Sequence, residues 1–339
     1  ITKQDVVDWA NKYLGPESYA IIYKREGKDP DEQKIAAPKI TPIVTNRDSQ
    51  SEFLSEIQTS QVQPIEPVFV DYKKDMSQFE AQPGIDVLYK KNETNDIFTL
   101  IYVFNTGTEN DPALNLAFNY LSYLGTDKMT AEEIASEMYD IACSFYMNAG
   151  ANQSSIQITG LSENMGKAME IVEGLIAGAK PDEAILENLK GDMLKSRADA
   201  KLNQSRCFGA LQRYLFYGGD FIRRTTLTDP ALQALTSEQL LAKIGGLMGK
   251  QHEVLYYGPQ KEAEVKSALA EHHKVAADLQ PLEKKFSTLL PTDANKVVLA
   301  QYDAKQLYYL QISNRGEKFD VAADPEITLY NEYFGGGMN

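Results

Sequence analysis

Residues 116–126 read LAFNYLSYLGT, and the rest of the chain is organised around this stretch. Its apolar side chains recur at helical spacing, which predicts an amphipathic helix with one face in a core. The apolar run 97–104 precedes it, with Asn105-Thr106-Gly107 and Asp111-Pro112 between the two. Because Gly and Pro mark turns and helix starts, the sequence predicts a strand that feeds a core helix through a turn.

Composition is that of a globular protein and argues against two other classes. The 339 residues, 43% hydrophobic and 24% charged, suffice for two or three domains with ordinary cores. The longest apolar runs, such as 97–104, are far shorter than the roughly 18 to 20 residues of a membrane helix, so we expect no membrane span. A formal net charge of −14 argues against nucleic acid, because phosphate binding needs clustered Lys and Arg.

The chain contains few cysteines and histidines, the residue types that most often bind metals or act as nucleophiles. They are Cys143, Cys207, His252, His272 and His273. Neither cysteine has a close Cys or His at zinc spacing, so each is interpreted as a small buried apolar residue. On a helix the side chains of His272 and His273 would point about 100° apart, and adding Glu271 does not give the spacing of metal ligands. We interpret these two histidines as a solvent-facing helical pair.

The predicted elements form one series of strands followed by helices. Strands 85–89 and 97–104, joined by a turn, suggest an antiparallel hairpin. Further strands are predicted at 145–149, 154–160 and 254–257, and helices from Thr130, Ser162 and Thr236 and from Pro181-Asp182 to about residue 202. The expected fold is α+β, with a mainly antiparallel sheet and helices packed on one face.

Two internal similarities suggest that one kind of domain recurs along the chain. Residues 2–27 align without a gap with 236–261, so that Thr2 falls on Thr236 and Ile21 on Leu255. Each segment reads as a capped helix, a Gly and a short strand. Residues 98–108 and 307–317 both carry an apolar strand and Asn-x-Gly, followed downstream by Asp-Pro at a helix start. Chance matching of short apolar patterns is the alternative to tandem duplication.

These similarities predict a division of the chain into parts of three domains. The expected parts are the end of a preceding domain at 1–27, a linker at 28–75 with one short helix at 51–57, a complete domain at 76–262, a linker helix at 263–295 and the beginning of a following domain at 296–339. The chain begins with Ile1 and ends in a Gly-rich stretch, so we expect it to be a piece of a longer protein.

The helix at 116–126 and its surroundings resemble the metal-binding region of the insulinase and pitrilysin-type zinc metallopeptidases, the inverzincins. The family helix carries H-x-x-E-H, and those places read Leu116, Asn119 and Tyr120 here. The likeness runs from about 84 to 261 and implies a LuxS/MPP-like metallopeptidase domain. The stretch 142–149 resembles the family edge strand, which pairs with extended peptide substrates. The resemblance therefore implies substrate contacts at Tyr146, Met147, Asn148 and Ala149.

The altered motif implies an inactive segment. In the family two histidines bind zinc, a glutamate between them acts as base and a later helix supplies an acidic ligand. Leu116 offers no lone pair, Tyr120 is a poor zinc ligand at neutral pH and Asn119 cannot accept a proton. The matching later helix offers only Glu187 and Asp192. We therefore expect no catalytic residue and no metal in this segment, with zinc in an upstream domain of the parent protein.

Two functions follow from the resemblance. The first is a catalytically inactive domain that forms part of a peptide-substrate chamber, with an active peptidase half of the same chain, or a homologous subunit, as partner. The alternative is a structural or adaptor subunit of the same fold with no active partner domain. An enzyme of unrelated chemistry is a third reading that no motif supports. The kind of organism that carries long family members suggests the periplasm or cell envelope.

Overall fold

The structure, a computed structural model, describes residues 2–15, 17, 19–24, 26–27, 36–43, 49–282, 287–316 and 318–335. The chain divides into two compact units, Ile1–Pro67 and Val68–Asn339. Residues 336–338 of the Gly-rich stretch lie outside the described residues. Among the residues that are described, no helix is both long and apolar enough to cross a membrane.

The first unit contains two short helices that the sequence predicted. Helix α1 (Lys3–Tyr13) begins at Thr2, whose side chain forms a capping box with Asp5, and α2 (Glu52–Thr59) begins at Ser51. Neither helix buries a side chain. The strand predicted near Ile21 is wrong, because residues 19–24 form no strand. A strand is held by hydrogen bonds to a neighbouring strand, and an apolar run alone does not supply that neighbour.

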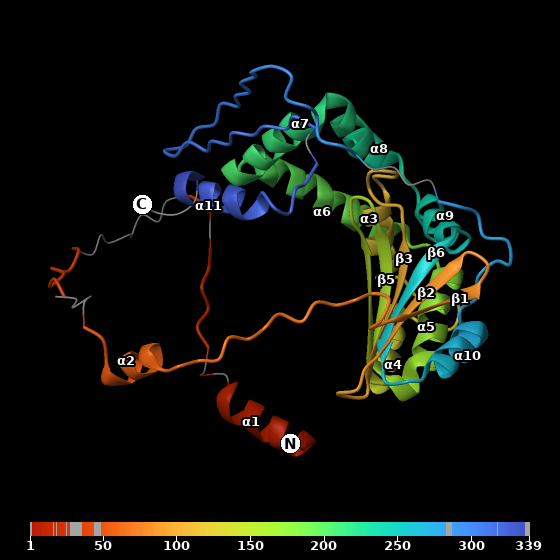
Figure 1. Cartoon of the computed structure of the whole chain (residues 1–339). Helices are drawn as coiled ribbons and strands as arrows, with labels where there is room; N and C mark the ends of the chain where they lie inside the picture. The colour runs from red at the N-terminus through yellow and green to blue at the C-terminus, as the bar shows by residue number, and fades with distance from the viewer. Residues whose placement is uncertain are drawn as a thin grey trace. The chain divides into compact units, whose positions relative to one another are not determined.

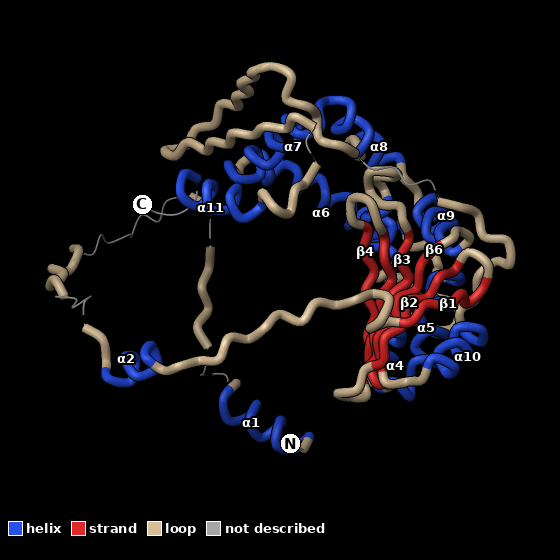
Figure 2. The backbone as a smooth tube through the Cα atoms, viewed as in Figure 1, coloured by secondary structure: helices blue, strands red, loops and turns tan. Residues whose placement is uncertain are grey.

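The second unit is built on one six-stranded sheet in the order β1-β2-β6-β3-β5-β4. Figure 2 shows the strands as a single layer. The strands are β1 (Ser77–Gln82), β2 (Ile85–Lys91), β3 (Ile97–Phe104), β4 (Cys143–Ala149), β5 (Ser154–Leu161) and β6 (His252–Gly258). Every neighbouring pair is antiparallel except β2 and β6, which are parallel. The expected mainly antiparallel sheet is confirmed.

The predicted hairpin between β2 and β3 is wrong, because β6 lies between them. Val254 in β6 is the partner of Val87 in β2 on one side and of Tyr102 in β3 on the other. Alternate residues of β6 are buried, so one face of this strand lies on the core. Turn signals report only neighbours in sequence, and β6 arrives from a distant part of the chain. Instead β2 forms its hairpin with β1, across a tight turn at Gly84 with φ of +90°.

Helices α7 (Gln204–Thr225) and α11 (Asp324–Gly335) contribute no described residue to the core of this unit. The other helices contribute to the core on one face of the sheet (Figure 1): α3 (Leu114–Leu121), α4 (Ala131–Asp140), α5 (Met165–Gly178), which follows the 3₁₀ turn η1 (Ser162–Asn164), α6 (Glu183–Lys201), α8 (Asp229–Ala234), α9 (Ser237–Met248) and α10 (Glu262–His272). Alternate residues of β3, from Phe98 to Phe104, are fully buried against them. The burial of this one face stabilises the layered α+β fold.

The predicted helix starts are confirmed, and side chains explain them. Thr130 and Thr236 form capping boxes with Glu133 and Gln239, and Asp182 accepts hydrogen bonds from two backbone N–H groups at the start of α6. Such caps satisfy N–H groups that have no partner inside the helix. The same capping device begins α1 and α9, the two helices that the internal alignment matches.

Helix α10 and the segments after it can be compared with the domain limits proposed from the sequence. Val265 and Leu269 of α10 are buried in the core, although the sequence division placed most of this helix in a linker. Further along, α11 begins at Asp324 as predicted. The strand expected at about 307–313 is wrong, since those residues form none. The division of the chain into domains remains a proposal.

The turn that leads into α3 depends on a close backbone approach at Gly107. Next to it, the N–H groups of Thr108 and Glu109 donate to the carbonyl oxygens of Gly150 and Ala151, at 2.8 and 2.9 Å. A Cβ at position 107 would overlap these same two carbonyl oxygens. Because both obstacles are backbone atoms, neither can move aside as a flexible side chain could.

We therefore expect Gly107→Ala to lower the free energy of unfolding by roughly 1–3 kcal/mol, through overlap with the backbone. Gly174→Ala is the matched control, because nothing lies within 4 Å of a Cβ there and the residue is within helix α5. Helix propensity predicts that this control gains about 0.5–1 kcal/mol. Urea denaturation followed by circular dichroism measures both. Equal stability of the two variants would contradict the close approach.

Candidate functional site

Helix α3 carries the three motif positions, and packing rather than solvent surrounds two of them. Leu116 is 3% exposed and Tyr120 is 0% exposed, whereas Asn119 is exposed and donates to Asn115 Oδ1 at 3.0 Å. The helix is held at its start by Asp111, which accepts from the backbone of Ala113 at 3.0 Å. The apolar face predicted from the sequence is the face that enters the core.

The hydroxyl of Tyr120 ties α3 to two other helices. It accepts a hydrogen bond from the backbone N–H of Asp182, at 2.7 Å, where α6 begins. It also lies 2.8 Å from Ser237 Oγ at the start of α9, and Ser237 is fully buried. A hydroxyl has one proton to donate and accepts others, so these contacts use its hydrogen-bonding capacity. Tyr120 therefore acts here as a buried structural link.

The two acidic residues considered as a later ligand lie on α6. Glu187 is exposed, and its carboxylate pairs with Lys190 Nζ at 2.7 Å. Lys190 is buried and also donates to the carbonyl oxygen of Gln233 at 3.2 Å. Asp192 is exposed to solvent. The Glu187 carboxylate thus balances a buried ammonium group.

The residues at the motif positions do not fit a zinc ion. Leu116 has no donor atom, the Tyr120 oxygen is engaged by α6 and α9, and the exposed Asn119 carries an amide. Zinc sites in proteins use Cys, His and carboxylate donors in groups of three or four. Within the part of the chain that the structure describes, no group of three or more such residues is placed to hold a metal ion. We derive no zinc chemistry at this helix.

Strand β4 occupies one end of the sheet order, so its outer edge pairs with no other strand of the described sheet. Of the four residues that the sequence singled out, Ala149 is buried and Met147 is half-buried on the helix side. Tyr146 and Asn148 are exposed on the opposite face. Tyr146, which is 64% exposed, stands in register with Gln157 of β5.

A shallow hollow of about 660 Å³ lies on this open face next to β4. The lining combines apolar side chains of the sheet with polar groups of the turn between β4 and β5: Ile101, Val103, Asn148, Gly150, Ala151, Asn152, Gln153, Ser154, Ser155 and Leu255. Apolar surface beside a few polar groups suits a side chain of an extended peptide. The sequence signal for this hollow is weak, because its residues come from three separate segments, 101–103, 148–155 and 255.

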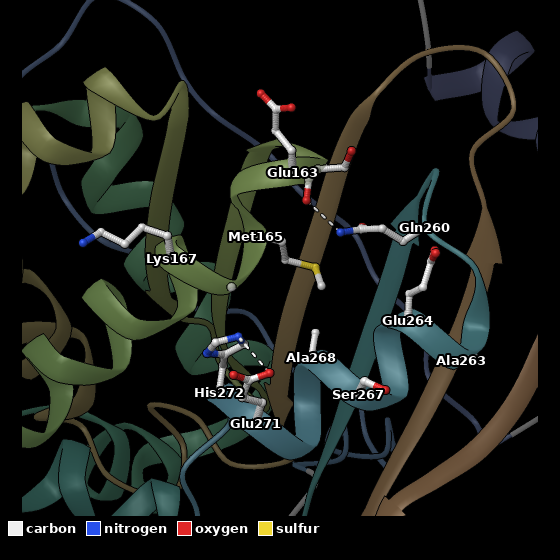
Figure 3. Close-up of a pocket in the computed structure, with 12 residues that line it drawn as sticks. Glu163, Met165, Lys167, Gln260, Ala263, Glu264, Ser267, Ala268, Glu271 and His272 are labelled. Atoms are coloured by element: carbon white, nitrogen blue, oxygen red, sulfur yellow. Dashed lines mark hydrogen bonds and ion pairs between the residues drawn. The ribbon is translucent and has the colours of Figure 1, made fainter.

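The interpretation of the adjacent histidines as solvent-facing is wrong for His273, which is buried, as is His252. His272 is partly exposed, with Nδ1 at 3.2 Å from Glu170 Oε1. Figure 3 shows it at one end of a groove of about 630 Å³ between the start of α5 and helix α10. The carboxylates of Glu163 and Glu271 in this groove do not converge on one point (Figure 3).

Burial sets the titration of two groups in this domain. The pKa of His252 falls to about 4, chiefly because burial disfavours the charged imidazolium. Burial also raises the pKa of the Cys143 thiol. A buried thiol that stays protonated is a poor nucleophile, which agrees with the interpretation of Cys143 as a small apolar residue.

Solved structures share this arrangement of sheet and helices. The chain superposes on the periplasmic protease PqqL from Escherichia coli with a TM-score of 0.57 and 14% identity over 88% of this chain and 31% of that one. The peptidase M16 inactive domain from Pseudomonas fluorescens superposes with a TM-score of 0.54 and 18% identity, over 64% of this chain and 54% of that one. The first half of PqqL superposes with a TM-score of 0.51 and 11% identity, over 64% of this chain and 50% of that one.

The chain has the fold of an M16 peptidase domain. It spans about a third of the length of the first M16-like neighbour and about half of the second. No family model matches the sequence, and no curated protein matches it. M16 is the insulinase-type fold that the residues around helix α3 resemble, so the suspected fold is confirmed.

The structural role of Tyr120 predicts that Tyr120→Phe lowers the free energy of unfolding by about 1–3 kcal/mol, because buried polar groups of α6 and α9 lose a partner. Adding Ser237→Ala to this variant should cause less loss than Ser237→Ala alone, since both ends of one bond are then removed. Chemical denaturation of the two single variants and the double variant measures this coupling.

Tyr123→Phe is the matched control, because Tyr123 lies two residues after α3 and is 56% exposed. Its hydroxyl removal should change stability by less than about 0.5 kcal/mol. Strictly additive losses for Tyr120→Phe and Ser237→Ala would show that the hydroxyl does not link the helices.

Proposed function

We propose that this chain is a catalytically inactive, peptidase-like domain that forms part of a peptide-substrate chamber, while zinc-dependent hydrolysis occurs in an upstream domain of a longer protein. The observation that carries the proposal is the state of helix α3 within an M16-type fold. The helix keeps its place beside the sheet, but Leu116 and Tyr120 are packed into the core and Tyr120 is bonded to α6 and α9. The position is used for packing, which supports a non-catalytic role.

The chamber role rests on the edge and open face of the sheet. Strand β4 has an outer edge, and an extended peptide can add to such an edge through main-chain hydrogen bonds. Tyr146 and Asn148 are exposed beside the hollow that contains Ile101 and Leu255. We propose that Tyr146 and Asn148 contact peptide side chains, while Met147 and Ala149 contribute through their backbone.

The proposed parent protein is a zinc metalloendopeptidase with several domains of this kind. In this proposal 1–27 ends a preceding domain, 76–262 is a complete one and 296–339 begins the next. A periplasmic protease among the structural neighbours supports a periplasmic or cell-envelope location. The active partner is a peptidase half of the same chain or a homologous subunit. A structural or adaptor subunit is the alternative outcome of the experiments below.

The first prediction concerns metal and hydrolysis. The chain, purified with an affinity tag that lacks histidine, should contain far less than one equivalent of zinc and should cleave no unstructured peptide. Inductively coupled plasma mass spectrometry and mass spectrometry of the peptides measure the two properties. The triple variant Leu116→His, Asn119→Glu, Tyr120→His should bind zinc weakly at best, because it also loses the bonds to α6 and α9. One equivalent of zinc with hydrolysis by the unaltered chain would refute an inactive domain.

The second prediction concerns peptide binding. Fluorescence anisotropy with a labelled, unstructured peptide should show saturable binding to the chain, weakened at least tenfold by Tyr146→Asp, because a charge at the strand edge disfavours pairing. Tyr139→Asp is the matched control, since Tyr139 is 83% exposed but lies on helix α4. Equal binding by both variants would remove β4 from the proposed contact surface. No binding at all, with no zinc, would favour the adaptor alternative.

A further inference from the structure

A chain of buried polar groups crosses the core of the second unit, away from helix α3. Its members come from four elements or their ends: Tyr102 of β3, Glu173 of α5, His252 of β6 and His273 at the end of α10. The Nε2 atoms of the two histidines are 2.9 Å apart. His273 Nδ1 lies 2.7 Å from Glu173 Oε1, and the side chains of that pair are 2% and 6% exposed.

At the His252 end the direction of the hydrogen bond is fixed. Its Nδ1 lies 2.7 Å from the backbone carbonyl oxygen of Lys250. A carbonyl oxygen can only accept, so Nδ1 carries the proton and donates it. In a neutral imidazole the other nitrogen then has a lone pair and no proton. The Nε2 atom of neutral His252 is therefore an acceptor that faces His273.

At the other end the carboxylate of Glu173 accepts from several donors. The hydroxyl of Tyr102 donates to Oε1 at 2.8 Å, and the backbone N–H of Lys274 donates to Oε2 at 2.6 Å. Burial, the charge of Glu173 and this bond raise the pKa of Tyr102, so its hydroxyl stays protonated. The short contact between Glu173 and His273 Nδ1 also requires a proton between its two atoms.

These fixed ends leave the contact between the two rings to be explained. If His273 carried only the proton on Nδ1, two Nε2 lone pairs would face each other at 2.9 Å without a hydrogen. Such a contact is repulsive, and at 2.9 Å it leaves no room for a water molecule between the two nitrogens. A hydrogen bond at this distance needs one proton between the nitrogens.

We propose that Glu173, His273 and His252 form a buried proton-binding site that holds one proton more than the same groups bind when exposed to neutral water. Three hydrogen bonds in series join the carbonyl oxygen of Lys250 to His252, His252 to His273, and His273 to Glu173. Each bond contains one proton, so the series contains three. Two neutral imidazoles supply two, and an ionised carboxylate supplies none. The extra proton balances the charge of the carboxylate, so the site as a whole is neutral.

Among the described residues, His273 and Glu173 are the titratable groups whose charges act on His252. From β3 the facing groups are Tyr102 and the ring of Phe104, which lies 4.7 Å from the His252 ring between centroids. From α5 the facing group is Glu173, and from α10 it is His273. The neighbouring His272 pairs instead with Glu170 of α5. Burial lowers the pKa of His252 to about 4, which disfavours a second proton on this ring near neutral pH.

The site joins two points that the fold needs to keep together. His252 is the first residue of β6, and His273 follows the last residue of α10. The proton between their rings therefore links the entry of β6 into the sheet to the place where the chain leaves α10. Loss of this proton would restore the lone-pair repulsion and loosen the end of α10.

The chain has three histidines, so selective ¹⁵N-histidine labelling of the whole protein gives a direct test. At pH 7.5 we expect a strongly downfield proton coupled to a ring nitrogen, slow to exchange, that assigns to the bond between His252 and His273. His272→Gln should remove one set of ring signals and leave this proton, whereas His252→Gln should abolish it. Two ordinary neutral imidazoles, each with one N–H proton, would refute the site.

A second measurement detects the extra proton from the pH dependence of the free energy of unfolding. Where the folded chain keeps a proton that the unfolded chain has released, the unfolding equilibrium constant rises tenfold for each pH unit. Between pH 7 and 8 this rise should be present in the unaltered chain and in His272→Gln. In Glu173→Gln, which lacks the balancing charge, the factor by which the unfolding equilibrium constant rises over this interval should be about tenfold smaller. The same pH dependence in all three proteins would refute the extra proton.

Acid should weaken the same site for a different reason. The pKa of His252 is lower in the folded chain, about 4, than the unperturbed value of roughly 6.5. The unfolded chain therefore binds more protons between these values, and the stabilising contribution of neutral His252 is lost as the pH falls from about 6.5 to 4. In denaturation across this range, His252→Gln should be less sensitive to acid than the unaltered chain. Equal sensitivity would contradict a buried neutral His252.

Discussion

The sheet depends on the pairing of β6 with β2 on one side and with β3 on the other. Without β6 the hairpin of β1 and β2 would have no ladder to the strands β3, β5 and β4. Backbone groups inside a sheet need partners on both sides, so this one strand holds two halves of the layer together. Helices α9 and α10 flank β6 in sequence and pack on the same core, which fixes where it enters.

Helix α3 combines core packing with a polar link to two other helices. In the M16-type arrangement this helix lies against the sheet, and its core face is fully occupied. Tyr120 adds a polar link inside that face, because its hydroxyl reaches the starts of α6 and α9. The same face therefore serves both packing and the alignment of three helices.

The buried polar chain that contains the two histidines begins at the first residue of β6. A polar chain in a core destabilises a fold unless every donor and acceptor has a partner. Here the chain runs from the carbonyl oxygen of Lys250 to the carboxylate of Glu173, and each end is satisfied by backbone or hydroxyl groups. Its position at the first residue of β6 means that the strand and the end of α10 are held by one set of directional bonds.

The sequence by itself determined the α+β class, most strands of the sheet, the capped starts of α4, α6 and α9, and the apolar face of helix α3. These features depend on periodicity and on neighbours a few residues apart, which a linear pattern records. Only the tertiary structure placed β6 between β2 and β3 and buried His273 beside His252. Both depend on contacts between segments distant in sequence, where pairing and burial are decided by which surfaces meet in the core.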